Sequence, residues 1–250
     1  MKVLAIDTST EACSAAVLLD DARIVSRFVL TERSHSELIL PMVDEVLRES
    51  GRTLAQLDGL AFGRGPGGFT GVRVAAGVIQ GLAFGAGLRV APVSSLAAVA
   101  AQVFFTTPAV AGEIGLFTSP TDVGEVKILV CNDARMHEVY WAAYRCDASD
   151  PSILHAITDE RVTAPDAIVV PDGVTQCAGN AFARYPALRE RLDRVGLHVH
   201  EAVYPHAAAI ARVGAAMLQN GQSVSAADAL PTYVRDNVAS PSRGPVTTMS

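Results

Sequence analysis

The chain has few of the residues that mark secreted, zinc-binding or nucleic-acid-binding proteins. Its four cysteines are scattered without a CxxC pair, which argues against a disulfide framework or zinc ribbon and favours a reducing compartment. Charged residues make up only 18% of the 250 residues, and the net charge of −6 gives no basic footprint for holding RNA or DNA directly. Strand-like sequence follows the first two residues without a signal peptide, so we expect a cytoplasmic protein.

Apolar sequence, by contrast, is abundant. Half of the chain is hydrophobic, so it must bury a substantial core, and its length fits one large domain or two small ones. The most apolar run, residues 72–88, contains Gln80 and recurring glycines, with Arg73 near its start. This composition predicts a buried helix rather than a membrane span.

The first 105 residues predict the element order βββαβαβα. Three short apolar stretches at the N-terminus predict an antiparallel meander. A helix is then expected to begin at Ser34, where Glu37 gives the capping-box spacing, and Thr70 is the expected N-cap of the next helix. The predicted strands lie at residues 3–6, 14–19, 23–30, 57–62 and 89–93, and the predicted helices at 34–51, 70–87 and 96–104.

The pattern restarts in the second half. Residues 106–124 are rich in Pro, Gly and Thr and predict a loop insertion. The segments that follow resemble a shorter copy of the first half, and the polar residues 239–250 are expected to form a disordered tail. Strands are predicted at residues 126–131, 138–144 and 157–162, and a long helix from about 205 to 218.

The glycine-rich stretch at residues 63–73 is the most informative motif. It fits the spacing of a phosphate-binding P-loop, but Phe69 stands where that loop needs a lysine. It also fits a dinucleotide fingerprint by spacing, but Arg89 stands about 20 positions on, where an acidic residue is required. The stretch therefore predicts a tight strand-to-helix turn made for close backbone packing more than for nucleotide chemistry.

The helix after this turn carries an unusual face. Gly77, Gly81 and Gly85 recur every four residues and so lie along one side of it. Each glycine costs roughly 1 kcal/mol against alanine in a helix interior, so three in register need a compensating reason. They could pack on an element of the same chain, or they could let the helix of another protein approach closely.

Two predicted helices together form a candidate interface. The first has a broad apolar stripe and the second has the glycine face, which suits homodimerisation or binding of a protein partner. The expected interface residues are Ile39, Met42, Val43, Val46, Arg73, Gly77, Gln80, Gly81 and Phe84.

Other constellations give weaker signals of chemistry. The turn Asp7, Thr8, Ser9 and Thr10 could hold a phosphate or metal, or simply end a strand, and we regard it as a possible vestigial nucleotide site. No Gly-x-Ser-x-Gly elbow and no HxxxH pair occurs, so no catalytic or metal-binding residues are expected. Asp133 and Arg135 are expected to form an internal ion pair in a turn.

Five segments occur in the order found in one known family. Residues 6–10, 34–38, 63–73, 133–140 and 231–235 resemble the TsaB (YeaZ) family of bacterial tRNA threonylcarbamoyladenosine biosynthesis proteins. The resemblance implies an α/β fold of the actin/Hsp70/sugar-kinase-like (ASKHA) type. Two lobes are implied, each with a mixed sheet flanked by helices, and the second lobe is reduced.

The same resemblance implies domain bounds. The first lobe would comprise residues 1–105 plus about 205–238, with the partner-binding helices. The second would comprise residues 106–204.

The resemblance also implies a role. The related TsaD carries a metal-binding histidine pair and transfers the threonylcarbamoyl group to the adenosine beside the tRNA anticodon. TsaB-like proteins pair with TsaD, are not thought to transfer the group, and form homodimers when alone. A TsaE-like ATPase would join the complex, and this chain would contact tRNA only indirectly, through that complex. The resemblance implies no cofactor and no membrane association.

One feature of the sequence agrees with this role, and two alternative functions remain open. The helix at 96–104, where the TsaD histidine pair would be sought, contains no histidine. An ATP-binding kinase or ATPase of the same fold is the first alternative, and a glycoprotease-like peptidase is the second.

Overall fold

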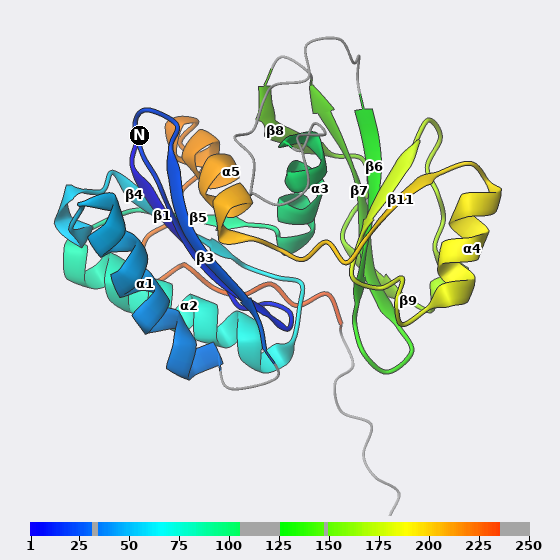
Figure 1. The fold of residues 1–250 in the computed structure, drawn as a ribbon, viewed down its shortest axis with the longest axis horizontal. Helices are drawn as coiled ribbons and strands as arrows, with labels where there is room; N and C mark the ends of the chain where they lie inside the picture. The colour runs from blue at the N-terminus through cyan, green and yellow to red at the C-terminus, as the bar shows by residue number, and fades with distance from the viewer. Residues whose placement is uncertain (32–34, 106–125, 148–149, 236–250) are drawn as a thin grey trace, which may run out of the picture.

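The chain folds into two lobes, each built on one mixed β-sheet with helices on both faces (Figure 1). This computed structural model describes residues 1–31, 35–105, 126–147 and 150–235. From one end to the other, the layers are α1 with α2, the first sheet, α5 with α3, the second sheet, and α4. The predicted two-lobed ASKHA architecture is confirmed.

The first sheet has the strand order β3-β2-β1-β4-β5. The meander β1–β2–β3 is antiparallel as predicted, whereas β4 pairs with β1, and β5 with β4, in parallel. Every residue of β1, β2 and β4 is buried, because helices cover both faces of the sheet. The bounds are β1 Val3–Asp7, β2 Ala12–Leu18, β3 Ile24–Leu30, β4 Gly59–Gly63 and β5 Val90–Val93.

The second sheet repeats this plan. Its order is β11-β10-β6-β7-β8, with β9 paired to β7. When this order is followed from β8 to β11, the two antiparallel pairings precede the two parallel ones, as they do from β3 to β5 in the first sheet. The predicted internal copy is therefore visible in the topology. The bounds are β6 Val126–Asp133, β7 Val139–Asp147, β8 Asp150–Ala156, β9 Arg161–Thr163, β10 Gln176–Gly179 and β11 His198–Glu201.

The helices show in what sense the second lobe is reduced. Between β3 and β4 the first lobe has α1, whereas between β8 and β10 the second lobe has only β9 and the short 3-10 turn Pro165–Ala167. Another 3-10 turn, Leu54–Gln56, precedes β4. The α-helices are α1 His35–Ser50, α2 Phe69–Ala86, α3 Ser95–Phe105, α4 Pro186–Arg194 and α5 Ala207–Gln219.

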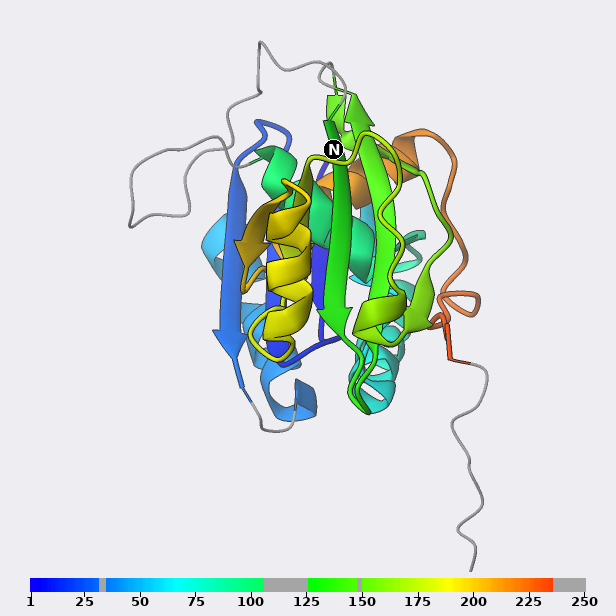
Figure 2. The same cartoon turned by 90° about the vertical axis from the view of Figure 1, so that its right-hand side faces the viewer.

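Helices α3 and α5 lie between the two sheets and join the lobes (Figure 1), and Figure 2 looks along this stack of layers with α4 nearest the viewer. Leu96 and Val99 of α3 pack on the second sheet, while Ala98 on its other side meets α5. Helix α5 comes from the C-terminal part of the chain but packs on the first sheet, and Ser14 in β2 accepts a hydrogen bond from the Ala207 amide at 3.0 Å. The C-terminal helix thus returns to the first lobe.

Some predicted boundaries differ from the structure. Helix α2 begins at Phe69 with Gly68 as N-cap, so Thr70 is not the cap. The strand predicted at 157–162 is replaced by β8, which ends earlier, and by the short β9. Ser34 and the segments 106–124 and 239–250 lie outside the described residues.

Among the described residues, α2 is the one helix with the length and hydropathy of a membrane span. Its inner side, however, packs into the core of the first lobe through Val72, Ala75, Ile79 and Ala83. This packing is that of a core helix, as predicted from the sequence.

Two helical glycines in contrasting environments test how helices pack on the sheet of the first lobe. A Cβ added at Gly214 of α5 would lie 2.5 Å from the Ala61 Cβ in β4, whereas one added at Gly77 of α2 would meet nothing within 4 Å. We expect Gly214→Ala to lower the free energy of unfolding by about 1–3 kcal/mol through overpacking. We expect Gly77→Ala, the matched control, to raise it by about 0.5–1 kcal/mol through helix propensity. Urea unfolding measures both, and equal effects of the same sign would contradict the packing.

Candidate docking surface and interlobe cleft

The glycine loop between β4 and α2 lies directly on the turn that follows β1. Gly68 donates its amide to the Ser9 carbonyl at 2.7 Å, and the Thr8 hydroxyl donates to the Gly71 carbonyl at 2.7 Å. A Cβ at Gly63, Gly67 or Gly71 would collide with Asp7, Ser9 and Thr8 respectively. The sequence prediction of close backbone packing is therefore confirmed. Glycine is needed at Gly67 and Gly71 because backbone carbonyls lie against them, and at Gly63 because the Asp7 carboxylate does.

Asp7 is sealed under this loop. Its carboxylate accepts hydrogen bonds from the Ser9 amide and hydroxyl, both at 2.9 Å, and from the Ser95 hydroxyl at 3.3 Å. The side chain is fully buried, and burial outweighs these hydrogen bonds and raises the pKa of Asp7 to about 6. Because Gly63 and Ser95 lie against the carboxylate, the turn has little room to present it to a ligand.

A cleft of about 620 Å³ remains between the lobes beside this turn. Residues Thr8–Glu11 and the glycine loop line one wall, and the β6–β7 turn around Arg135 lines the other. His35, at the start of α1, also lines the cleft, and burial lowers its pKa. Two contacts bridge the lobes here, from Tyr140 hydroxyl to Gly67 carbonyl at 3.4 Å and from Asn180 amide to Glu11 at 3.3 Å.

The segment 229–235, which we call the strap, crosses from the first lobe to the second (Figure 1). Its Thr232 amide donates to the Arg64 carbonyl at 2.7 Å, and its Arg235 guanidinium reaches the Ala134 carbonyl at 3.1 Å and the Glu138 carboxylate. The strap also separates the cleft from a second hollow of about 520 Å³ next to the Arg64–Glu160 ion pair. Both hollows are lined by residues 232–234.

Helix α2 presents its glycine face to solvent. Gly77, Gly81 and Gly85 are exposed, and a Cβ at any of them would meet nothing within 4 Å. Phe84 on the same side is 86% exposed and Arg73 is also exposed. No element among the described residues covers this face, so packing within the chain does not account for the three glycines.

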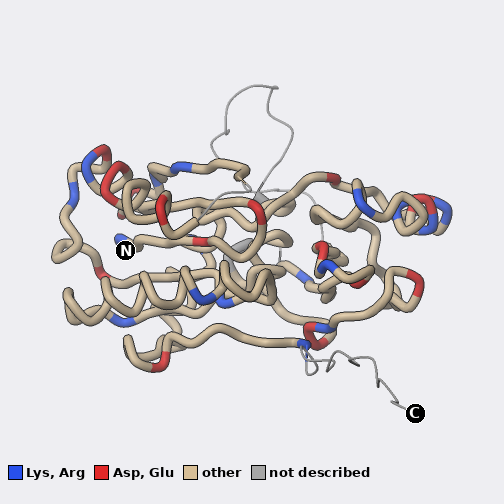
Figure 3. The backbone as a smooth tube through the Cα atoms, turned by 90° about the horizontal axis from the view of Figure 1, so that it is seen from below, with Lys and Arg blue, Asp and Glu red and all other residues tan. Residues whose placement is uncertain are grey.

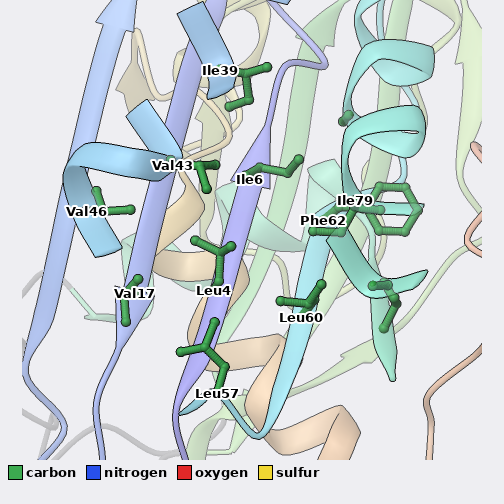
Figure 4. Packing of buried hydrophobic residues seen from close by; sticks show 14 of the residues in the cluster. Leu4, Ile6, Val17, Ile39, Val43, Val46, Leu57, Leu60, Phe62 and Ile79 are labelled. Atoms are coloured by element: carbon green, nitrogen blue, oxygen red, sulfur yellow. The ribbon is translucent and has the colours of Figure 1, made fainter. Parts of the chain in front are cut away.

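The expected interface was too broad on α1. Ile39, Val43 and Val46 are buried against the first sheet in the lobe's own core (Figure 4), so they cannot contact a partner in this conformation. Their spacing is that of an ordinary core-facing stripe, which the sequence could not distinguish from an interface. The exposed apolar residue of α1 is instead Leu40, at 51%.

Two more of the expected interface residues are engaged within the chain. Met42 is half-buried, with its Sδ 3.7 Å from the Cys13 Sγ. Gln80 is half-buried and donates from Nε2 to the Ala229 carbonyl at 3.2 Å. Arg73, Gly77, Gly81 and Phe84 are therefore the members of the predicted set that lie on the surface.

A cluster that the sequence analysis missed lies at the start of α2. The Arg73 guanidinium carbon is 3.3 Å from the centroid of the Phe69 ring and 4.6 Å from that of Tyr233 in the strap. Phe69 and Tyr233 as whole residues are 59% and 50% exposed. We call these three residues the stacked cluster. Only the four-residue spacing of Phe69 and Arg73 could have hinted at it, because Tyr233 is distant in sequence.

The remaining candidate residues show no catalytic arrangement. Asp133 Oδ2 lies 3.7 Å from Arg135 Nε within one turn, as expected for an internal ion pair. His200 pairs with Gln176 at 2.9 Å across neighbouring strands, and its ring meets that of His198 edge-on. No group of three or more His, Cys, Asp or Glu suited to a metal occurs within the described part of the chain.

Comparisons with known proteins agree over nearly the whole length. A family model described as TsaD, tRNA N6-adenosine threonylcarbamoyltransferase, matches residues 29–242. A protein of Escherichia coli named tRNA threonylcarbamoyladenosine biosynthesis protein TsaB is 36% identical, covering 96% of each chain. The protein of the same name from Haemophilus influenzae is 35% identical, covering 95% of each.

A solved structure extends this likeness to three dimensions. The structure titled YeaZ from Pseudomonas aeruginosa superposes with a TM-score of 0.76 at 34% identity, covering 93% of this chain and 99% of that one. Sequence and fold thus agree over the same span of the chain. The protein belongs to the TsaB family, within the wider group that the TsaD family model describes.

Proposed function

We propose that this protein is a non-catalytic partner of a TsaD-like transferase in the threonylcarbamoylation of the tRNA adenosine beside the anticodon. The family relationship supports the pathway, since the curated relatives carry that pathway in their names. The exposed glycine face of α2 is the observation that carries the partner role. A helix with three uncovered glycines in register can approach another helix closely, and the stabilisation lost in the free chain is then regained in the complex.

The residues of the candidate site favour a non-catalytic role over catalysis of threonylcarbamoyl transfer. Helix α3 occupies the place where the related transferases carry their histidine pair, and it contains none. Asp7, the one carboxylate at the end of β1, is covered by the glycine loop. Neither α3 nor the covered Asp7 therefore offers a nucleophile or a metal ligand that a peptidase could use.

The partner set follows from the same surface. The α2 face would serve a homodimer when the chain is alone and the TsaD-like partner when both are present, so the two states compete. A TsaE-like ATPase would join through the complex, in the cytoplasm. Contact with tRNA would be indirect, because basic residues are interspersed with acidic ones along the chain (Figure 3) and the net charge is −6.

The docking face can be blocked by a bulky side chain. We expect Gly77→Trp or Gly81→Trp to abolish binding to a purified TsaD-like partner, because the indole would hold the helices apart. The monomer should stay folded, since a Cβ added at either position would meet nothing within 4 Å beyond the helix itself. Size-exclusion chromatography of the mixture measures the complex, and thermal unfolding measures the fold.

A matched control lies on the second lobe. Arg194 at the end of α4 has a side chain that is 75% exposed, and Arg194→Trp should leave the complex intact. Unchanged binding by the Gly77 and Gly81 variants, or equal loss with Arg194→Trp, would overturn the proposed docking face.

The nucleotide-binding alternative has one observation in its favour, the cleft beside Thr8–Glu11. Its weakness is the state of Asp7. In a site that uses this carboxylate to hold a magnesium nucleotide, the charge would be stabilised by the ligand. Here the turn holds it buried and at a cost to the native state.

Asp7 gives a pH-dependent test. Its native pKa of about 6 exceeds the model value of 3.8, so its proton stabilises the native state below pH 3.8 and this effect is lost as pH rises through 6. We expect Asp7→Asn to raise the free energy of unfolding at pH 7.5 by up to about 3 kcal/mol. The gain should shrink as pH falls from 6 towards 4, as urea unfolding would measure.

A different result would favour the alternative. If calorimetry showed micromolar binding of ATP with Mg²⁺ and turnover, and Asp7→Asn removed both, the carboxylate would be a nucleotide ligand. Destabilisation by Asp7→Asn at every pH would mean that the turn requires the charge.

A further inference from the structure

The strap connects the glycine loop and α2 of the first lobe with the β6–β7 turn of the second lobe, which is far from them in sequence. It is held to α2 by Gln80, which donates to the Ala229 carbonyl at 3.2 Å, and to the glycine loop by the Thr232 amide. At its far end, Arg235 binds the β6–β7 turn of the second lobe through Ala134 and Glu138. The strap is therefore hydrogen-bonded to both lobes.

The stacked cluster is exposed and already ordered. The Arg73 guanidinium lies between the Phe69 and Tyr233 rings, and its Nη1 donates to the Phe69 carbonyl at 2.9 Å. Arg73 also lies one helical turn before Gly77, so the cluster continues the exposed face of α2 onto the strap. Aromatic and Arg side chains that are fixed before binding lose little entropy and dominate many protein interfaces.

The chemistry around the cluster favours a protein over RNA. Two neighbouring arginines that could hold phosphates are already paired, Arg135 with Asp133 and Arg235 with Glu138. Arg73 makes no ion pair with a described residue, and its outer edge faces solvent. One such cation suits a single carboxylate on a partner better than a polyanionic backbone.

We propose that the docking face does not end on α2 but extends onto the strap, with the stacked cluster as its anchor for the TsaD-like partner. The partner is expected to place an apolar helix side on Phe69 and Tyr233 and a carboxylate opposite Arg73. This rests on the proposed function, because the partner is the one named there.

The strap then transmits docking to the cleft. Arg135, Met136 and His137 in the β6–β7 turn all have left-handed backbone angles, with φ of 61°, 53° and 60°. Such residues are costly unless their surroundings hold them, and Arg235 binds the residues on both sides of the three. A partner that fixes Tyr233 also fixes Arg235, and so steadies this wall of the cleft.

The anchor is tested by affinity for the purified TsaD-like partner. We expect Tyr233→Ala to weaken binding at least tenfold, because it removes one ring from the stack, and Tyr233→Phe to bind like wild type. Arg73→Ala should weaken binding to a similar degree. Val195 on the second lobe is 62% exposed, and Val195→Ala should leave the affinity unchanged. Thermal unfolding checks that each variant is folded.

The outcomes separate this inference from the function on which it rests. If Tyr233→Ala binds normally while Gly77→Trp does not, the docking face ends on α2 and the inference is wrong. If the wild-type chain does not bind the partner, the proposed function itself fails. If Tyr233→Ala keeps its partner affinity but loses affinity for tRNA in the complex, the cluster is an RNA contact and the inference is overturned.

Hydrogen exchange tests the transmission. Partner binding should slow amide exchange in residues 134–138 of the wild-type chain, and Arg235→Ala should remove that slowing while the complex still forms at saturating partner. If the slowing persists in Arg235→Ala, or never occurs in wild type, the strap does not couple docking to the cleft.

Discussion

The structure depends on one contact between two stretches of backbone, the glycine loop against the turn after β1. Gly63, Gly67 and Gly71 bring the loop so close to Asp7, Thr8 and Ser9 that no side chain fits between them. This contact fixes where α2 begins and how it lies on the sheet. It thereby also decides which side of α2 enters the core and which side faces solvent.

The same contact changes what the turn can do. A turn of this composition after the first strand could offer amides and hydroxyls to a phosphate, but here the Thr8 hydroxyl donates to the Gly71 carbonyl, and the Ser9 amide and hydroxyl donate to Asp7. Asp7 stays ionised at neutral pH only against the opposition of its surroundings, as its raised pKa records. Asp7, Thr8 and Ser9 are therefore buried beneath the glycine loop at the start of α2.

Local patterns in the sequence predicted the elements of the first lobe and the resemblance implied the two lobes, but neither predicted the surface. The meander, the strands at 57–62 and 89–93 and the tight loop were predictable, because alternation, strand length and glycine spacing are local signals. Ile39, Val43 and Val46 were wrongly assigned to an interface because a core stripe and a docking stripe have the same period. The stacked cluster could not be predicted, since Tyr233 meets Arg73 only after the chain has crossed both lobes.

The glycines show how the same sequence spacing can serve either packing within the chain or an exposed surface. Two sets of three recur at intervals of four residues, one at 63, 67 and 71 and the other at 77, 81 and 85, and the sequence presents them alike. The first set is explained within the chain, because each member touches the turn after β1. The second set touches nothing described and lowers the helix propensity of α2 by roughly 1 kcal/mol at each position. This cost, which no contact among the described residues offsets, is the physical reason for proposing the open face of α2, and not the cleft, as the site through which the protein acts.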